Sequence, residues 1–236
     1  MRKTYWLEWF NYYGSPPLQK SPPVKGGVAR VSLSRTREET AGAHRARLQS
    51  WVDYFEGQPA IAVVLLAGRA SDQLMEAAFG LDALRALFSK ESVLTSLDCI
   101  AGASRLKYLH LNYADRLADV AGLGFLDGLK GLGVCPARNV SDFMSLQGLN
   151  GLRQLRMGHP DGKLQPVDAL EPVIGDGCFS HLELRDVKPL DGNWEPLLRL
   201  RGLRYLTLPR SVPADLRREV CSNNPALPAA GAGSGL

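Results

Sequence analysis

The stretch Leu106-Lys-Tyr-Leu-His-Leu111 decides the fold, because its pattern L-x-x-L-x-L recurs along the chain. The other copies, of which the first two are weaker, begin at these positions: Ile61, Leu84, Leu129, Leu152, Phe179 and Leu203. Successive copies start 23, 22, 23, 23, 27 and 24 residues apart. A near-constant period of this size predicts a repeat architecture, in which each unit packs against the next.

The residues between the copies keep the same register. Four apolar positions recur after 23 residues, so that Leu117, Val120, Leu123 and Leu126 are followed by Val140, Phe143, Leu146 and Leu149. Within a copy the last two leucines alternate with other residues, which predicts a short strand. The later apolar residues come at every third position, which suits turns of 3₁₀ helix. Each unit is therefore a strand, a turn and a short return segment, and the units must stack to bury their leucines.

The pattern resembles the leucine-rich-repeat family, in the 22-to-24-residue form found in bacterial internalin-like proteins, over about residues 61–208. The resemblance implies an α/β fold: a right-handed solenoid with a parallel concave β-sheet of about seven strands, irregular or 3₁₀ return segments and a helical N-terminal cap. The chain departs from the family in one respect. Three residues after the last strand leucine, where the family usually places Asn or Cys, stand Ala114, Ala137, Pro160, Val187 and Ser211. The turns must therefore satisfy their backbone groups in another way.

The chain divides into three predicted parts. Residues 1–57 hold an aromatic segment, a linker and a capping helix, residues 58–222 form the solenoid with its C-terminal cap, and residues 223–236 form a disordered tail. The six aromatic residues within 1–14 favour a lid over the first repeat, and an interaction patch is the alternative. Residues 28–33 could form a short strand.

Helices are predicted at three places. An apolar stripe with helical spacing ends at Trp51, Val52 and Phe55, and Thr36 with Glu39 has the spacing of a capping box that would start this helix. Residues 70–80 favour a helix as the first return segment. Residues 213–220 predict a capping helix with a proline in its first turn. The longer unit that starts at Leu152 predicts an insertion in the form of a bulged loop.

The composition narrows the function classes. The net charge of +4 is small and the basic residues are scattered, which argues against nucleic-acid binding. No apolar run approaches 18 residues and no signal peptide is recognised, which favours a cytoplasmic protein or one exported without a cleavable signal. The four cysteines form no C-x-x-C motif, which argues against a zinc site, and Cys99 and Cys178 are expected in the core. No catalytic or cofactor-binding motif is present.

The residues that alternate with the strand leucines should form an exposed, concave surface. The candidate protein-binding residues are Tyr108, His110, Asn112, Gln154, Arg156, His181, Glu183, Arg185 and Tyr205. Aromatic and arginine side chains are enriched at binding hot spots. Gly131 and Gly133 predict a shallow dip in this surface. The two histidines lie three strands apart, roughly 14 Å, which is too far for one metal ion.

Three function hypotheses follow. The resemblance implies a non-enzymatic module that binds a protein partner through the concave face, in an effector, toxin-neutralising or scaffold role. The alternative is a structural or regulatory subunit segment packed in a larger assembly. An enzyme with an unrecognised site is the least favoured of the three.

Overall fold

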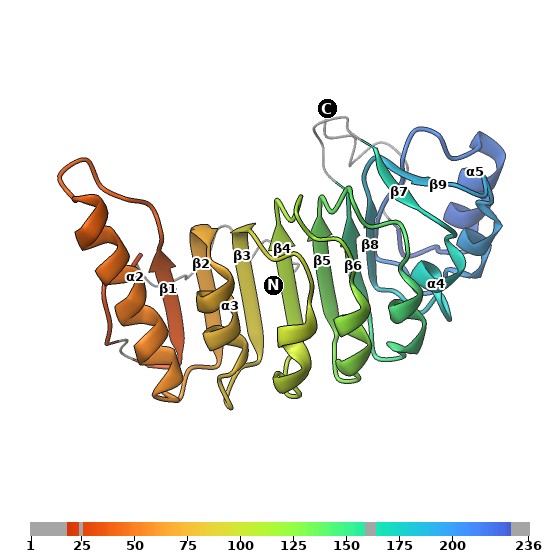
Figure 1. Cartoon of the computed structure of the whole chain (residues 1–236). Helices are drawn as coiled ribbons and strands as arrows, with labels where there is room; N and C mark the ends of the chain where they lie inside the picture. Colours follow the sequence, from red (N-terminus) through yellow and green to blue (C-terminus); the bar gives the residue numbers. More distant parts are fainter. Residues whose placement is uncertain (1–17, 24–25, 159–163, 228–236) are drawn as a thin grey trace.

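The computed structural model describes residues 18–23, 26–158 and 164–227, and in these ranges the chain forms an elongated stack of coils (Figure 1). Eight parallel strands make one sheet in the order β1-β2-β3-β4-β5-β6-β8-β10. The strands are β1 (Val28–Ser32), β2 (Val63–Ala70), β3 (Ala86–Ser92), β4 (Tyr108–Asn112), β5 (Gly131–Cys135), β6 (Gln154–Met157), β8 (His181–Leu184) and β10 (Tyr205–Thr207). All seven sequence copies are therefore strands of one parallel sheet, and β1 adds an eighth.

The strand register confirms the repeat. In five consecutive copies the central leucine is aligned with the next across the sheet, through Leu87, Leu109, Leu132, Leu155 and Leu182. All five side chains are buried between the sheet and the return segments. The core is thus a continuous ladder that no single unit could bury alone.

The return segments form a second layer against one face of the sheet. They are α3 (Asp72–Phe79), four 3₁₀ helices and the short α4 (Glu171–Ile174); the 3₁₀ helices are η1 (Asp98–Gly102), η2 (Ala121–Phe125), η3 (Met144–Gly148) and η4 (Glu195–Arg199). Each packs against the return segment of the next coil. The predicted helix over 70–80 is present as α3, with the Ser71 hydroxyl accepting from the Leu74 N–H at 3.3 Å.

The insertion is more regular than the predicted bulged loop. Its strand β7 (Gln165–Val167) pairs in parallel with β9 (Val187–Pro189), which follows β8, and the two make a separate two-stranded sheet. Gln165 is buried, and its Nε2 donates to the carbonyl oxygens of Ala137 and Val140, both at 2.9 Å. Its Oε1 accepts from the Ala137 N–H at 2.8 Å. A glutamine from the insertion therefore satisfies the turn at a position where the family usually places Asn.

The N-terminal cap begins later than the capping box predicted. Helix α2 (Ala41–Glu56) has Thr40 as its N-cap, whose hydroxyl accepts from the Ala43 N–H at 3.1 Å. The Glu39 Oε2 does accept from the Thr36 N–H at 3.3 Å, as in a capping box, but no helix starts there, and the Glu39 Oε1 also forms an ion pair with the Arg47 Nε at 2.8 Å. Trp51 and Phe55 are buried, as the apolar stripe predicted. Because β1 belongs to the same sheet as the repeats, this cap is continuous with the solenoid.

The C-terminal cap is α5 (Ala214–Ser222) together with the residues that follow it. Asn224 is buried, donates to the carbonyl oxygens of Leu200 and Val220 at 3.0 and 2.8 Å, and accepts from the Leu203 N–H at 3.0 Å. The ordered cap therefore extends beyond residue 222. The aromatic segment 1–14 and residues 228–236 lie outside the described residues, so the lid and the disordered tail stay predictions.

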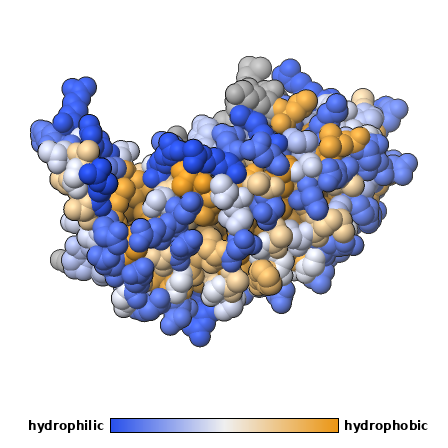
Figure 2. All heavy atoms as spheres, in the orientation of Figure 1, coloured by the Kyte–Doolittle hydropathy of each residue, from blue (hydrophilic) through white to orange (hydrophobic). Residues whose placement is uncertain are grey.

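The cysteines only partly follow the prediction. Cys99 packs against the core, but Cys178 is exposed because the neighbouring Phe179 fills the core position at this turn. Cys135 is the buried one. None of the described helices is long and apolar enough to cross a membrane. Figure 2 shows a surface on which hydrophobic residues are interspersed with hydrophilic ones. The side chain of Phe125 in η2 is one of the exposed large hydrophobic ones.

Candidate functional site: the concave face

The concave face is the sheet surface opposite the return segments, and two rows of side chains run across it. Because side chains alternate along a strand, residues beside the aligned leucines point away from the core. The first row, read across the sheet, is Val28, Val63, Ala86, Tyr108, Gly131, Gln154, His181 and Tyr205. The second row is Arg30, Leu65, Phe88, His110, Gly133, Arg156, Glu183 and Thr207. Seven of the nine predicted residues stand in these two rows, whereas Asn112 is the last residue of β4 and Arg185 directly follows β8.

The N-terminal half of the concave face is apolar. Leu65 and Ala86 are buried there, and the partly buried side chains of Val63, Phe88 and Tyr108 pack against them. Of this group the sequence reasoning named only Tyr108. The signal was available, since Phe88 stands 22 residues before His110 and is aligned with it across β3 and β4. The surface prediction rests on the stronger copies alone and therefore omits the apolar half.

The middle of the face holds a ring where the sequence predicted a dip. The imidazole of His110 stacks on Phe88, with 4.9 Å between ring centroids and 7° between the ring planes. A Cβ added to Gly133 would overlap the His110 Nδ1, so the glycine provides the space that this ring occupies. The predicted dip at Gly133 is therefore wrong, because the side chain of the neighbouring strand fills it. Burial, together with the positive charge of Arg156, lowers the pKa of His110 to about 3.

The C-terminal half of the face is charged. Glu183 is buried, and its Oε1 lies 3.4 Å from the Arg156 Nε of the adjacent strand β6. The same carboxylate oxygen accepts a hydrogen bond from the Arg185 Nε. Two guanidinium groups thus neutralise one buried carboxylate and leave the trio with a net positive charge. A partly buried group of this kind offers N–H donors in a fixed arrangement.

Three further predicted residues frame this charged half. His181 stacks on the exposed Tyr205 with 6.2 Å between ring centroids, and its Nδ1 lies 2.9 Å from the Ser180 hydroxyl. Burial and the charge of Arg204 lower the pKa of His181. The Gln154 Oε1 is buried without a hydrogen-bond partner among the described residues. The described part of the chain contains no cluster of three or more His, Cys, Asp or Glu side chains that could hold a metal ion.

The repeat register and the two layers define a leucine-rich-repeat α/β solenoid. Among solved structures it is similar to two internalins of Listeria monocytogenes str. 4b F2365, so its fold is internalin-like. The internalin InlF matches with a TM-score of 0.55 and 18% identity, over 76% of this chain and 46% of that one. The internalin InlC2 matches with a TM-score of 0.56 and 21% identity, over 74% of each chain. No protein-family model matches the sequence, and no curated protein matches it.

Proposed function

We propose that the chain is a non-enzymatic protein-interaction module that binds a protein partner through its concave face. The observation that carries the proposal is the division of this face into an apolar half and an arginine-rich half. Protein interfaces combine an apolar, aromatic centre with polar and arginine contacts around it. The two halves lie on one continuous sheet, so a single partner surface can contact both.

The rigidity of the sheet supports this proposal. The concave side chains project from parallel strands whose neighbours are fixed by backbone hydrogen bonds, and several are held by contacts with each other. His110 is held against Phe88, and Arg185 against Glu183. Side chains that are ordered before binding lose less conformational entropy when a partner docks. An effector, a toxin-neutralising protein or a scaffold would each use such a surface.

The test begins with affinity capture from host lysate and continues with purified partner. The captured protein is titrated by calorimetry against the native chain, a Tyr108→Ala variant and an Arg185→Gln variant, which change one half of the face each. The matched control carries Phe125→Ala and Arg105→Gln, two exposed residues outside the concave face. Circular dichroism and thermal melting establish that all four proteins are folded.

We expect each concave variant to bind at least about tenfold more weakly, which corresponds to about 1.4 kcal/mol, while the control binds like the native chain. Equal binding by all four proteins contradicts the concave face as the site. Weaker binding by the control alone would move the site to the return-segment side and favour the structural or regulatory alternative.

A further inference from the structure

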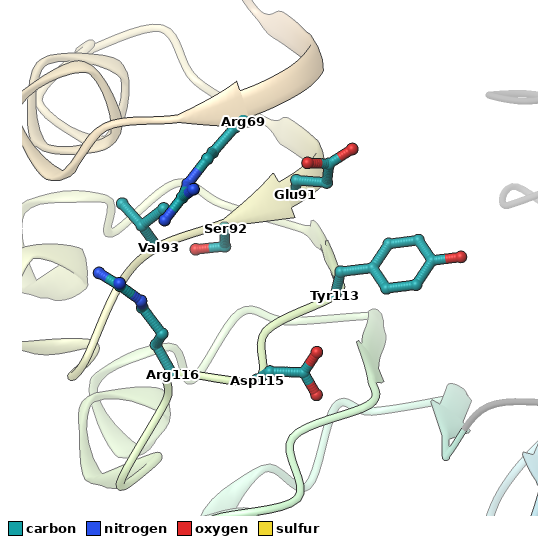
Figure 3. A pocket seen from close by; sticks show the side chains of 7 residues that line it. All are labelled: Arg69, Glu91, Ser92, Val93, Tyr113, Asp115 and Arg116. Atoms are coloured by element: carbon teal, nitrogen blue, oxygen red, sulfur yellow. The ribbon is translucent and has the colours of Figure 1, made fainter. Parts of the chain in front are cut away.

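A pocket of about 340 Å³ lies outside the two concave rows, where β2, β3 and β4 end (Figure 3). Its walls come from three successive coils, and they include Arg69 at the end of β2, Ser92 and Val93 at the end of β3, and Arg116 after β4. The pocket is therefore built at the rim of the sheet, beside its apolar half. No residue of this pocket was a candidate in the sequence reasoning.

The backbone on both sides of the pocket is specialised. The register between β2 and β3 shifts between Leu66 and Arg69, and the intervening Gly68 has a φ of +125°. A Cβ at Gly68 would lie 3.1 Å from the Leu33 Cβ, so both the conformation and the space favour glycine there. Such a bulge redirects the side chain that follows it, which here is Arg69.

The opposite wall is fixed by a second unusual turn. Tyr113 has a φ of +50°, and its N–H donates to the Cys135 carbonyl of the next coil at 2.6 Å. The Ala114 N–H donates to the Pro136 carbonyl at 3.1 Å. These bonds hold the turn that leads to Arg116. The two arginine side chains thus project from backbone segments that contacts with neighbouring coils hold in place.

The two guanidinium groups point to the same side of the pocket. In Figure 3 they lie on either side of Val93, with the Ser92 hydroxyl nearby, while the Glu91 carboxylate points away from them. Neither Arg69 nor Arg116 has a hydrogen-bond or ion-pair partner within the ranges that the structure describes. Asp115 is paired with Arg138 instead, at 3.4 Å between Oδ1 and Nη1.

Within the described residues, the pocket therefore holds two arginines that form no ion pair with the two acidic residues of its lining, Glu91 and Asp115. Two guanidinium groups that line the same pocket can both donate to an anion placed between them. The Ser92 hydroxyl accepts from the Leu94 N–H at 3.3 Å, which leaves its own proton free to donate. Guanidinium groups bind carboxylate and phosphate oxygens in a two-pronged geometry, so the donor set matches an oxyanion.

We propose that this rim pocket binds an oxyanion, a carboxylate or a phosphate group, between Arg69 and Arg116, with the Ser92 hydroxyl as a further donor. The group belongs either to an acidic segment of the protein partner or to a free anion. In the first case the inference deepens the proposed function and rests on it, because the pocket adjoins the apolar half of the concave face. Binding of a small anion needs no partner.

The experiment measures binding of two probes, inorganic phosphate and a hexaglutamate peptide with blocked ends, at constant ionic strength. The readout is the NMR shift of the arginine side-chain Nε–H signals, followed to saturation. The pocket variant is Arg69→Gln with Arg116→Gln. The matched control is Arg37→Gln with Arg210→Gln, which removes the same charge from two exposed arginines elsewhere.

We expect at least one probe to saturate the native chain and the control, and to bind the pocket variant at least about tenfold more weakly. Saturation by phosphate assigns a free anion, and saturation by hexaglutamate alone assigns an acidic segment. A second variant, Arg69→Lys with Arg116→Lys, keeps the charge and loses the two-pronged geometry, so its affinity should be intermediate. The lysine variant also replaces the glutamine variant in this comparison if the glutamine variant does not fold.

Failure to saturate with either probe, or equal binding by the native chain and the pocket variant, overturns the inference. The outcome is separable from that of the proposed function. The Tyr108→Ala and Arg185→Gln variants leave the pocket intact and should bind the probes like the native chain. If the pocket binds an anion but the concave face binds no partner, this inference holds and the proposed function is refuted.

Discussion

Replacing His110 by phenylalanine should make the stability of the protein less dependent on pH. The His110 ring is only 2% exposed, stacked on Phe88 and lodged above Gly133, so it folds in its neutral form. Burial and the charge of Arg156 lower its pKa to about 3, from an ordinary value of 6.5. Phenylalanine keeps an aromatic ring beside Phe88 and removes the titratable nitrogens.

The size of the effect follows from proton binding. Between pH 6.5 and pH 3 the unfolded chain protonates this histidine and the folded chain does not, so the unfolded state binds more protons and stability falls as the pH falls. From pH 7.5 to pH 5.0 this single group should lower the free energy of unfolding by about 2 kcal/mol. At pH 7.5 the histidine is neutral in both states, so its protonation does not lower the free energy of unfolding there.

The assay is urea denaturation of both proteins at pH 7.5 and pH 5.0. His181, whose pKa is also lowered, and the paired carboxylates contribute to both proteins, so the difference between the two losses isolates His110. We expect the native chain to lose about 2 kcal/mol more than the variant, with similar denaturant slopes. Equal losses would refute the reasoning, because they would mean that His110 is protonated in the folded state or exposed to water.

Three further predictions concern the fold. Replacing Gln165 by leucine should lower the free energy of unfolding by about 3 kcal/mol, measured by urea denaturation, because buried backbone groups lose their partners. Replacing Gly158 by alanine should cost about 1–3 kcal/mol or more in the same assay, because its φ is +75° and the new Cβ would overlap the Arg185 carbonyl oxygen. A thiol reagent should label Cys178 in the folded protein and Cys135 only after unfolding, since Cys135 is buried and its pKa is raised to about 12.

The repeat could be predicted from the sequence because its signal is local and repeated. Each copy places its leucines at the same spacing, so errors in one unit do not disturb the others. The sequence indicates strand β1 only as a possible strand, because it precedes the first copy of the pattern. Its partner β2 follows it in the chain only after the whole of helix α2. The hydrogen bonds of Gln165 could not be predicted from the sequence, because its partner Ala137 lies 28 residues earlier in the chain.

The candidate surface was predictable in part for a related reason. Alternation along a strand determines which residues face away from the core, and it places His110 and Glu183 on the face opposite the core. The predicted exposure is wrong for both, because neighbouring side chains leave them only 2% and 4% exposed. The surroundings of these two residues depend on the direction of each side chain, which cannot be predicted from residue spacing. The His110 ring over Gly133 and the carboxylate of Glu183 between two arginines both require the structure.

The two copies with the weakest pattern are also those that form the apolar half of the concave face. Where later copies carry polar residues or glycine, the copy at Ile61 has Val63 and Leu65, and the next has Ala86 and Phe88. These apolar residues fill the positions between the core leucines and so obscure the alternation by which a copy is recognised. Sequences depart from the simplest pattern for their fold most often at functional sites. The loss of pattern in these two strands is therefore itself an argument that the apolar half of the concave face contacts a partner.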